Sequence, residues 1–472
     1  MLNWSYRKIF FVSLALHLVC AIFSIGFQHG DEHVQVYEFL NFKLGGLSED
    51  LLPWEFRDQV RPWIQVYFYY FITKISNIFG AFSPFSLAMI FRISSAILGV
   101  VSLWGLIPLL KDWFSSERYS KLSYIMLNLF WFMPFLHVRT SADFMSGCLF
   151  IFGMSFFLRS LKNNHIMMAL MGGLFLGASY NVRYQLALMI AFLWFWAIGF
   201  SRKSTGPIIV SALAIGFMIG AGVVVDYFGY GEWTFAPYNL FVSNFLDHRL
   251  KNSGEDPFWF YVVKSFKVGI PPLSLALIVA TSWGIFKKYK HPLTWAIVPL
   301  LIFHTMIGHK ELRYIYPIVF LSPIYLAWFF EAFEKKYLNE NWSKRLIGFF
   351  VVINFLLLTF VLFKPAKESL RLYKFLYDKD IKTVYTPIVD KKKFDFTLHF
   401  YKKPSLKTIG FNPSGGSWNH KYILTTKLRE KKLIEENRSC EVIFSSYPSW
   451  IEKVNFTNWL KRSSYYILWE CR

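Results

Sequence analysis

Charged residues are scarce in this chain of 472 residues: they make up 17% of it, whereas hydrophobic residues make up 54%. A soluble protein of this composition would expose large apolar patches and aggregate. Aromatic residues reach 20%, with 52 Phe, which suits lipid-facing helices and the aromatic belts at membrane surfaces. The composition therefore argues against an ordinary soluble globule and predicts a membrane protein.

Acidic residues are fewer than basic ones, 30 against 51, which leaves a net charge of +21. This charge could indicate nucleic-acid binding, but many basic residues lie in short loops between apolar runs or beyond residue 364. No basic helix or aromatic RNA-binding motif accompanies them. Basic loops are the usual topology signal of membrane proteins. We therefore expect membrane lipid, and no nucleic acid, as a partner.

Cysteine is also rare, with four residues in all. Cys20 and Cys148 lie in apolar runs, and the simplest interpretation is that they are small core residues. Cys440 and Cys471 lie in the polar tail, where an extracytoplasmic location would permit a disulfide, although the sequence leaves their pairing open. No Cys/His cluster has the spacing of a structural zinc site.

Apolar runs dominate residues 1–364. Because a spanning helix needs about 20 residues, we predict about eleven spans, at roughly 9–27, 84–110, 122–138, 141–161, 165–181, 184–200, 207–228, 269–286, 292–308, 314–333 and 345–363. Residues 64–82 are apolar as well. We interpret them as a helix along the interface, because a further span would invert every later loop.

The charges orient this array. With the N-terminus in the cytoplasm, the short basic loops all face the cytoplasm, as the positive-inside rule requires; they contain Lys111, Arg118 and Lys121, Arg159 and Lys162, Arg202 and Lys203, Lys287, Lys288 and Lys290, and Lys335, Lys336, Lys344 and Arg345. The opposite side receives the loop 28–83. An odd number of spans places the tail 365–472 on that side too. Short apolar runs between turns predict that this tail is a small extracytoplasmic α/β domain.

The sequence His29-Gly30-Asp31-Glu32-His33 directly follows the first apolar run. Taken alone, a solvated loop would explain it. The same loop also contains Trp54, Glu55 and Arg61, and further polar residues interrupt later apolar runs on the same side: Arg139, Arg183, Asp226, Tyr230, Asn239, His309, Lys310, Glu311 and Arg313. Each could be an interfacial residue or a helix cap. Charged groups at membrane depth are costly, so their gathering on one side predicts a functional cavity.

Carboxylates and cationic side chains in one cavity have a natural chemistry. Arg binds phosphate through its planar set of donors, and Lys adds a compact charge. A carboxylate can take the proton of a hydroxyl while cations stabilise a departing phosphate. Apolar walls that run into the bilayer would hold a lipid chain. The residues therefore predict transfer of a group from a lipid phosphate to a hydroxyl.

The motifs HGDEHVQ, PWE, RTSAD, NVRYQ, DYFGYGEW and HKELRYIYP together resemble glycosyltransferase family 22, in order from about residue 29 to residue 317. That family contains the mannosyltransferases of N-glycan and GPI-anchor assembly and has bacterial relatives. The resemblance implies a GT-C fold in residues 1–364. It also implies transfer of mannose, with inversion, from a polyprenyl-phosphate-sugar donor to a glycan or glycolipid hydroxyl.

The resemblance also implies roles for residues. Asp31 matches the general base, and Glu32 would hold Asp31 or the acceptor in place. His309, Lys310, Glu311 and Arg313 match a motif that would bind the phosphate and sugar of the donor. Further substrate-binding candidates are Arg139 and Arg183 in the same anionic pocket, and His29, His33, Trp54, Glu55, Arg61, Asp226, Tyr230 and Asn239.

Gly30 stands where the family often has Pro, and Ala142 stands where Asn is common. The identity of the acceptor therefore does not transfer. Carboxylates could bind a divalent metal, but Arg and Lys can neutralise a departing monophosphate, so we expect no essential cofactor.

Two other functions stay open: a GT-C transferase of another sugar or to a protein, and a transporter of a lipid-linked sugar. The sequence has no convincing internal repeat of the kind common in transporters. We favour a bacterial inner membrane with the site facing the periplasm. The sequons at Asn437 and Asn455 keep the lumen of the endoplasmic reticulum open.

Overall fold

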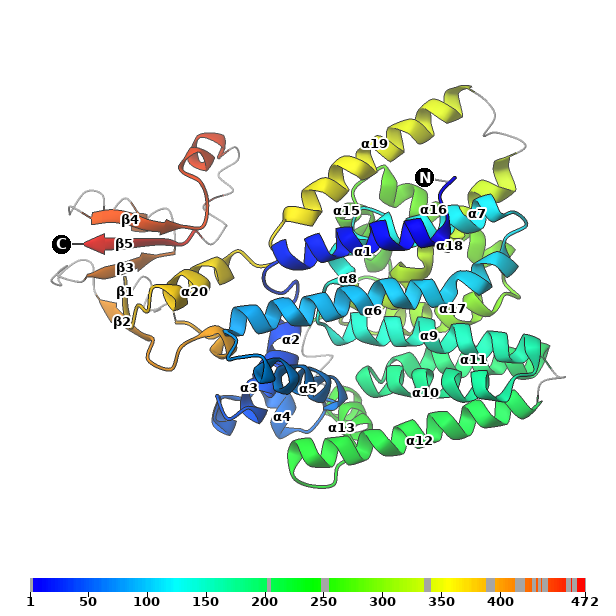
Figure 1. Cartoon of the computed structure of the whole chain (residues 1–472), viewed down its shortest axis with the longest axis horizontal. Coiled ribbons are helices and arrows are strands. Elements are labelled where there is room, and N and C mark those ends of the chain that lie inside the picture. The colour runs from blue at the N-terminus through cyan, green and yellow to red at the C-terminus, as the bar shows by residue number, and fades with distance from the viewer. Residues whose placement is uncertain are drawn as a thin grey trace.

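A bundle of long apolar helices forms most of the molecule, and a small sheet domain stands at one end of it (Figure 1). The computed structural model describes residues 3–201, 205–247, 254–334, 341–387, 395–411, 421–426, 430–431, 434, 440–455, 460 and 465–471. Within these residues, six helical segments are long and apolar enough to cross a membrane: α1 (Tyr6–Phe23), α6 (Pro84–Trp113), α9 (Ala142–Asn163), α12 (Thr205–Tyr230), Leu312–Phe333 and α19 (Asn341–Phe363).

Four shorter apolar helices complete the bundle: α10 (Ile166–Val182), α11 (Leu186–Phe200), α16 (Leu273–Lys287) and α17 (Pro292–Met306). The span Leu312–Phe333 consists of a short 3₁₀ turn, η4 (Leu312–Ile315), followed by α18 (Tyr316–Phe333). Ten of the predicted spans thus correspond to these helices in the described part of the chain. The prediction of a multi-pass helical membrane protein is confirmed.

The remaining predicted span, 122–138, is broken into α7 (Glu117–Leu129) and α8 (Met133–His137). Asn354 of α19 fills the break: its Oδ1 accepts a hydrogen bond from the Trp131 N–H at 2.8 Å, and its Nδ2 donates to the Leu129 carbonyl at 3.0 Å. Backbone groups in a bilayer cannot turn to water, so a side chain from a neighbouring helix takes the place of the missing helical bonds.

Small residues set the closest helix contacts. Gly172 and Gly173 of α10 face different neighbours: a Cβ on Gly172 would lie 2.7 Å from the Phe157 nitrogen in α9, and one on Gly173 would collide with Ser211 and Ala214 in α12. Such close approach is how membrane helices gain packing energy without a hydrophobic drive.

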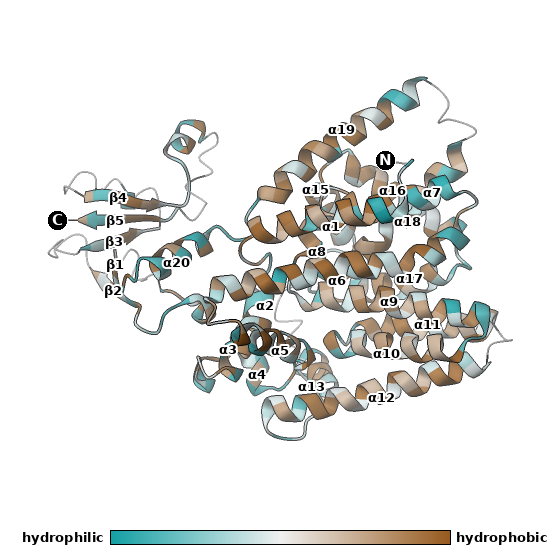
Figure 2. Cartoon of the chain, in the orientation of Figure 1, coloured by the Kyte–Doolittle hydropathy of each residue, from teal (hydrophilic) through white to brown (hydrophobic). Residues whose placement is uncertain are grey.

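Figure 2 shows these helices as mostly hydrophobic, with hydrophilic residues towards the helix ends and in the sheet domain. Of the predicted basic loops, Arg202, Lys203, Lys335 and Lys336 lie outside the described residues.

The loop after α1 folds into short helices: α2 (Gly30–Glu32), η1 (His33–Glu38), α3 (Phe39–Lys43), η2 (Glu49–Leu51), α4 (Trp54–Arg57) and α5 (Ile64–Ile78). The first three form one continuous helix with a π-helical middle, hereafter the helix 30–43. α5 buries Gln65, Val66 and Tyr69 and exposes Phe68, Phe71, Ile75 and Ile78. This two-faced pattern is typical of a helix in a membrane interface. A second group on the same side comprises α13 (Ala236–Phe241), η3 (Val242–Leu246) and α15 (Phe260–Val268).

The C-terminal part begins with α20 (Ser369–Asp378) and continues with five strands: β1 (Thr383–Pro387), β2 (Lys407–Phe411), β3 (Tyr422–Thr425), β4 (Cys440–Ser445) and β5 (Ile467–Cys471). The sheet order is β2-β1-β3-β5-β4; β1 is parallel to β2 and β3, and β5 is antiparallel to both of its neighbours. Cys440 and Cys471 are directly opposite each other and form a disulfide. The predicted α/β domain is confirmed, and the pairing that the sequence left open is found.

The sheet domain and the first loop share one hydrophobic core. Phe27, Tyr37 and Phe39 of the loop pack with Leu370 and Tyr401 of the C-terminal part. The chain between α19 and α20 is tied to the end of α1, because the amides of Ala366 and Lys367 donate to the Ile25 carbonyl. The tail therefore lies on the same side of the bundle as the loop 28–83, as an odd number of membrane crossings requires.

Candidate active site

Asp31 sits in the first turn of the helix 30–43, just after the chain leaves α1. A carboxylate is favoured at this end of a helix, where unpaired backbone N–H groups carry partial positive charge. Gln35 lies one turn further along and donates to Asp31 Oδ2 at 2.6 Å. The π-helical segment that follows widens the helix by one residue per turn, a distortion that is frequent at functional sites.

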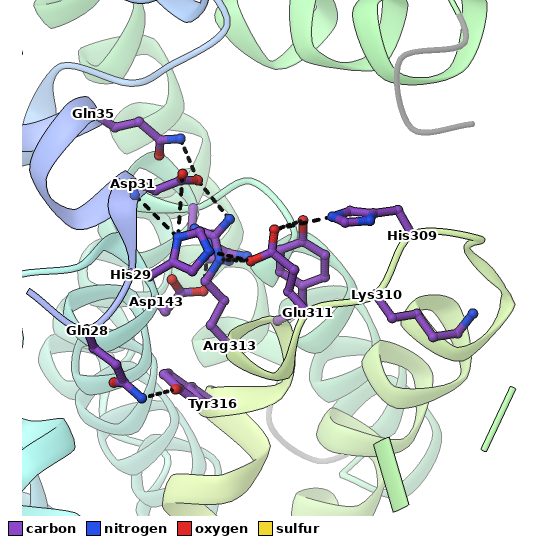
Figure 3. A network of polar contacts seen from close by, with 12 residues as sticks. Gln28, His29, Asp31, Gln35, Asp143, His309, Lys310, Glu311, Arg313 and Tyr316 are labelled. Carbon is purple, nitrogen blue, oxygen red and sulfur yellow. Dashed lines mark hydrogen bonds and ion pairs between the residues drawn. The ribbon is translucent and has the colours of Figure 1, made fainter. Parts of the chain in front are cut away.

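Cationic side chains from two distant segments surround Asp31 (Figure 3). Arg313, from the short turn before α18, places Nη2 2.7 Å from Asp31 Oδ2. Arg61, from the same loop as Asp31, lies 4.0 Å from that oxygen and 3.8 Å from Glu55. The motifs HGDEH and HKELR, which lie far apart in the sequence, therefore meet in one ion-pair network.

Glu311 and His29 complete this network. Glu311 Oε2 accepts from Arg313 Nε at 2.6 Å and lies 3.0 Å from His29 Nε2, and its Oε1 lies 3.2 Å from His309 Nε2. His29 Nδ1 in turn lies 3.5 Å from Asp31. Figure 3 shows the His29 ring between the two carboxylates. The imidazole thus bridges Asp31 and the HKELR motif.

These contacts shift the protonation equilibria. The hydrogen bonds of His29 with Asp31 and Glu311 raise its pKa to about 9, so the imidazole is charged at neutral pH. Burial alone would raise the pKa of Asp31, but the hydrogen bond with His29 and the charges of Arg313 and Arg61 outweigh it and hold the pKa well below its usual value. Glu311 behaves alike, because His29 and Arg313 outweigh its burial and lower its pKa. Both carboxyl groups are therefore ionised.

A separate ion pair also lines the site. Asp143 stands in the first turn of α9, which the Ser141 side chain caps by accepting from the Phe144 N–H at 3.3 Å. Asp143 pairs with Arg183 at 2.7 Å, and both side chains are almost fully buried. Removing one partner of such a buried pair leaves the other charge uncompensated.

Two cavities meet at Asp31. The smaller has a volume of about 40 Å³, and its lining includes the polar side chains of Gln35, Gln65, Ser141, Asp143 and Gln185. The larger has a volume of about 430 Å³ and is partly open to solvent, and its lining includes the apolar side chains of Leu188, Phe241, Phe245, Phe303 and Ile307. Asp31, Arg61, Arg183 and Arg313 line both. Three arginines and one carboxylate therefore form a rim where the two cavities meet.

Ten of the sixteen predicted site residues line one or both cavities: His29, Asp31, Glu32, Trp54, Glu55, Arg61, Arg183, His309, Glu311 and Arg313. Three others support this rim from behind. Tyr230 exchanges hydrogen bonds with the backbone of Arg61, Asp226 accepts from the Trp63 N–H at 2.8 Å, and Asn239 donates to the Gln59 carbonyl at 3.4 Å. They hold the segment 59–63, and with it the Arg61 guanidinium, in place.

The remaining three lie outside the cavities. Arg139 is buried and donates to the carbonyls of Phe135, Gly26 and Ser24, which ties the end of α1 to α8. Because its guanidinium is used on backbone oxygens, its predicted place in the anionic pocket does not fit the structure.

Lys310 points away from the network in Figure 3, and its ammonium donates to the carbonyls of Asp256, Ile307 and Gly308. His33 is buried on the far side of the helix 30–43, 2.6 Å from Glu38. These placements indicate that Lys310 shapes the loop that presents Glu311 and Arg313, and that His33 anchors the helix.

Glu32 lines the smaller cavity but is 2% exposed and fully bonded. Its Oε1 accepts from the N–H and hydroxyl of Thr140 at 2.7 and 2.9 Å, and its Oε2 accepts from the Gln28 N–H at 3.0 Å. These bonds fasten the helix 30–43 to the start of α9. The geometry fits the predicted role of holding Asp31 better than that of holding an acceptor.

Several residues of the site escaped the sequence prediction. Gln35, Gln65 and Asp143 line the smaller cavity, and Asp143 stood within the RTSAD motif without a role. His304 lines the larger cavity, is 3% exposed, and has no hydrogen-bond partner on either ring nitrogen among the described residues. The sequence offered one sign of His304: it is a histidine inside an apolar run, shortly before the HKELR motif.

The carboxylates of the site are already matched by cations. Among the residues that the structure describes, no group of three His, Cys, Asp or Glu side chains has the arrangement of a metal site. Asp31, Glu55 and Glu311 each face an arginine instead. The residues therefore suit an anion that competes for the arginines.

The sequence matches the Alg9-like mannosyltransferase family over residues 8–401. The chain belongs to this family. Among curated relatives it is 23% identical to the mannosyltransferase APTG1 of Arabidopsis thaliana, over 70% of this chain and 60% of the relative. It is 22% identical to GPI alpha-1,2-mannosyltransferase 3 of Bos taurus, over 65% of this chain and 55% of the relative. The chain thus spans little more than half the length of these relatives.

Solved structures show the same fold. ArnT from Cupriavidus metallidurans, bound to undecaprenyl phosphate, matches with a TM-score of 0.55 at 11% identity and covers 98% of this chain and 97% of its own. The oligosaccharyltransferase of Archaeoglobus fulgidus matches with a TM-score of 0.53 at 11% identity, over 90% of this chain and 70% of its own. The predicted GT-C fold and the family 22 resemblance are confirmed.

Proposed function

We propose that this membrane protein is a glycosyltransferase that moves mannose from a polyprenyl-phosphate donor to a hydroxyl of a glycan or glycolipid. The observation that carries the proposal is the position of Asp31 at the junction of two cavities, beside Arg61, Arg183 and Arg313. The larger cavity has apolar side chains that can line a lipid chain, and the smaller one brings polar side chains up to Asp31. Membership of a mannosyltransferase family supports mannose as the sugar.

The donor would occupy the larger cavity. Its phosphate would meet Arg183, Arg313 and the unpartnered nitrogens of His304, and the polyprenyl chain would lie along Phe241 and Phe303 towards the bilayer. Arginine suits a phosphate because it can offer two parallel donors. The bound undecaprenyl phosphate of ArnT, a protein of the same fold, supports a donor of this class.

The smaller cavity has room only for the reacting end of the acceptor, where Gln35, Gln65 and Gln185 would offer hydrogen bonds to its hydroxyls. Asp31 would take the proton of one hydroxyl as its oxygen attacks the anomeric carbon. The bond from that carbon to the phosphate oxygen breaks, and its electron pair leaves on the polyprenyl phosphate. Attack opposite to the leaving group inverts the anomeric centre.

Arg313 would link the two substrates. Without substrate it is shared between Asp31 and Glu311, which makes Asp31 a weak base. A donor phosphate would compete for this guanidinium, so the pKa of Asp31 would rise towards its usual value when the donor binds. Because arginines supply the positive charge, we propose that no metal is essential, and expect EDTA to leave transfer unchanged.

The test is transfer by the purified protein from a panel of polyprenyl-phosphate sugars to short lipid-linked glycans. We expect mannose to be transferred and Asp31→Asn to lower kcat by roughly 10²–10⁴-fold at saturating donor, the usual contribution of a general base. Asp50→Asn, in an exposed turn of the same loop and outside both cavities, is the matched control. Undiminished turnover by Asp31→Asn would remove the base assignment, and transfer of another sugar alone would replace mannose.

The site is proposed to face away from the cytoplasm. All basic loops that the structure describes join the opposite helix ends, and the disulfide of the sheet domain suits an oxidising compartment. A bacterial periplasm fits these features, and the lumen of the endoplasmic reticulum is the alternative. Labelling of a single engineered cysteine at Asp50 in sealed vesicles of known orientation would decide the side.

A further inference from the structure

The helix 30–43 has two faces with different tasks. Asp31 and Gln35, four residues apart, point to the cavities. His33 and Tyr37, also four residues apart, point the other way and are 1% and 2% exposed. Residues four apart lie on the same face of a helix, so whatever packs behind His33 and Tyr37 also sets the position of Asp31.

The C-terminal domain covers this rear face. Its short turn η6 (His399–Tyr401) enters the core of the first loop. The Tyr401 ring lies 5.6 Å from His33 at an interplanar angle of 18°, and the Phe27 ring lies 5.3 Å from His33 at an angle of 30°. The Phe400 ring lies 5.0 Å from Tyr37.

A polar contact reinforces the stacking. The Phe400 N–H donates to Glu38 Oε1 at 3.3 Å, and the same oxygen lies 2.6 Å from His33 Nε2. The other oxygen of Glu38 is buried and has no hydrogen-bond partner among the described residues. A buried carboxylate with so few partners depends on each of them.

The turn η6 is itself anchored in the C-terminal domain. The N–H of Leu398, the residue before η6, donates to the Tyr373 hydroxyl of α20 at 3.3 Å. The Phe396 ring packs edge-on against the Tyr373 ring, with 5.0 Å between the ring centroids. The sheet domain therefore reaches the helix 30–43 through residues 396–401, hereafter the arm. The residues that match the family, 8–401, end at this arm, although most of the sheet lies beyond it.

We propose that Phe400 and Tyr401 are positioning residues of the active site, through which the C-terminal domain holds the helix 30–43 and with it Asp31. This inference rests on the proposed function in giving Asp31 the role of base. The helix follows a bend after α1 and has a π-helical middle, so its own hydrogen bonds do not fix its orientation. Small displacements of a catalytic group are costly in rate, which makes a rear support functionally important.

The test compares three variants of the full-length protein. Tyr401→Ala removes the stacked ring, Tyr401→Phe keeps it, and Tyr465→Ala removes a tyrosine that is 2% exposed in a separate core of the sheet. We expect Tyr401→Ala to lower kcat by roughly 10–100-fold, the scale of a displacement of about 1 Å, with the donor KM within about twofold of wild type. Tyr401→Phe and Tyr465→Ala should retain kcat. If Tyr401→Ala does not fold, Tyr401→Leu, which fills the space without stacking, takes its place with the same expectation.

A second measurement does not depend on catalysis. Amide hydrogen exchange of residues 30–43 should become at least tenfold faster in Tyr401→Ala and stay unchanged in Tyr465→Ala. Unchanged exchange, wild-type kcat in folded Tyr401→Ala, or an equal kcat loss in Tyr465→Ala would each overturn the proposal. If wild-type protein transfers no sugar from any donor but exchange responds as expected, the proposed function fails while the mechanical link stands.

Discussion

The side chain of His29 contacts both the first loop and the segment before α18. Its imidazole lies 3.0 Å from Glu311 and 3.5 Å from Asp31, and it carries a positive charge because these carboxylates raise its pKa to about 9. The charges of this network belong to the first loop and to the segment before α18, which lie far apart in the sequence. The ion pairs of His29 therefore contribute to holding the two segments together.

This leads to a prediction on pH and stability. The pKa of His29 is higher in the folded protein than its ordinary value of about 6.5. Its contribution to stability is therefore fully present below pH about 6.5 and is lost as pH rises through about 9. We expect wild type to have a higher Tm than His29→Gln at pH 6 and the same Tm near pH 10. A difference that does not change with pH would contradict the charged state of His29.

At the scale of elements, the helix 30–43 is held at both ends and from behind. Glu32 fixes its first turn to Thr140 between α8 and α9, and Lys43 at its other end donates to the Phe228 carbonyl of α12 at 2.8 Å. The Glu32 side chain is 2% exposed. Glu32 therefore has a structural role, whereas its neighbour Asp31 is the proposed base.

The prediction for Glu32 follows. Glu32→Ala would leave the buried N–H and hydroxyl of Thr140 without their acceptor, at a cost on the order of 3 kcal/mol in the free energy of unfolding. Glu32→Gln keeps one carbonyl oxygen and should lose less than half of that. Denaturant unfolding in detergent measures both, with Asp50→Asn as the surface control. Equal stability of Glu32→Ala and wild type would show that the bonds to Thr140 are not formed in solution.

Hydrophobic length and charge predicted the helices of the bundle, the side shared by the polar turns, and the strands of the tail. They did so because these features depend on local patterns. The break between α7 and α8 was missed, since Asn354, which stabilises it, comes from a helix more than 200 residues later. The sequence could not distinguish Arg139 and Lys310 from Arg61 and Arg313, which line the cavities. The direction in which Arg139 and Lys310 point depends on which backbone carbonyls the fold brings within their reach.

At the scale of the whole molecule, the disulfide and the arm lie in different parts of the C-terminal domain. Cys440 and Cys471 join the strands β4 and β5, whereas η6 precedes β2 at the opposite edge of the sheet. The two cysteines of the disulfide are 31 residues apart in the sequence. Its effect on Asp31 is therefore indirect, through the stability of the domain.

We expect the double variant Cys440→Ser, Cys471→Ser to lose about 2–4 kcal/mol of stability in the sheet domain, the usual effect of removing such a cross-link. Because the arm is attached elsewhere, kcat at low temperature should be retained, while the temperature of half-inactivation falls. Activity after heating, compared with wild type with and without reductant, measures this. Identical inactivation temperatures would show that the disulfide does not limit the stability of the domain.

The contact between Phe400 and Glu38 spans 362 residues, and this has a consequence for biogenesis. The ribosome delivers Asp31 at the start of synthesis and the arm that supports it only after the last span has been inserted. During translation the nascent chain therefore contains Asp31, the arginines and the residues of both cavities before the helix 30–43 is supported. We expect such a chain to be nearly inactive until its end has been translocated and has folded. Sugar transfer would then begin only in molecules that have passed every step of membrane insertion.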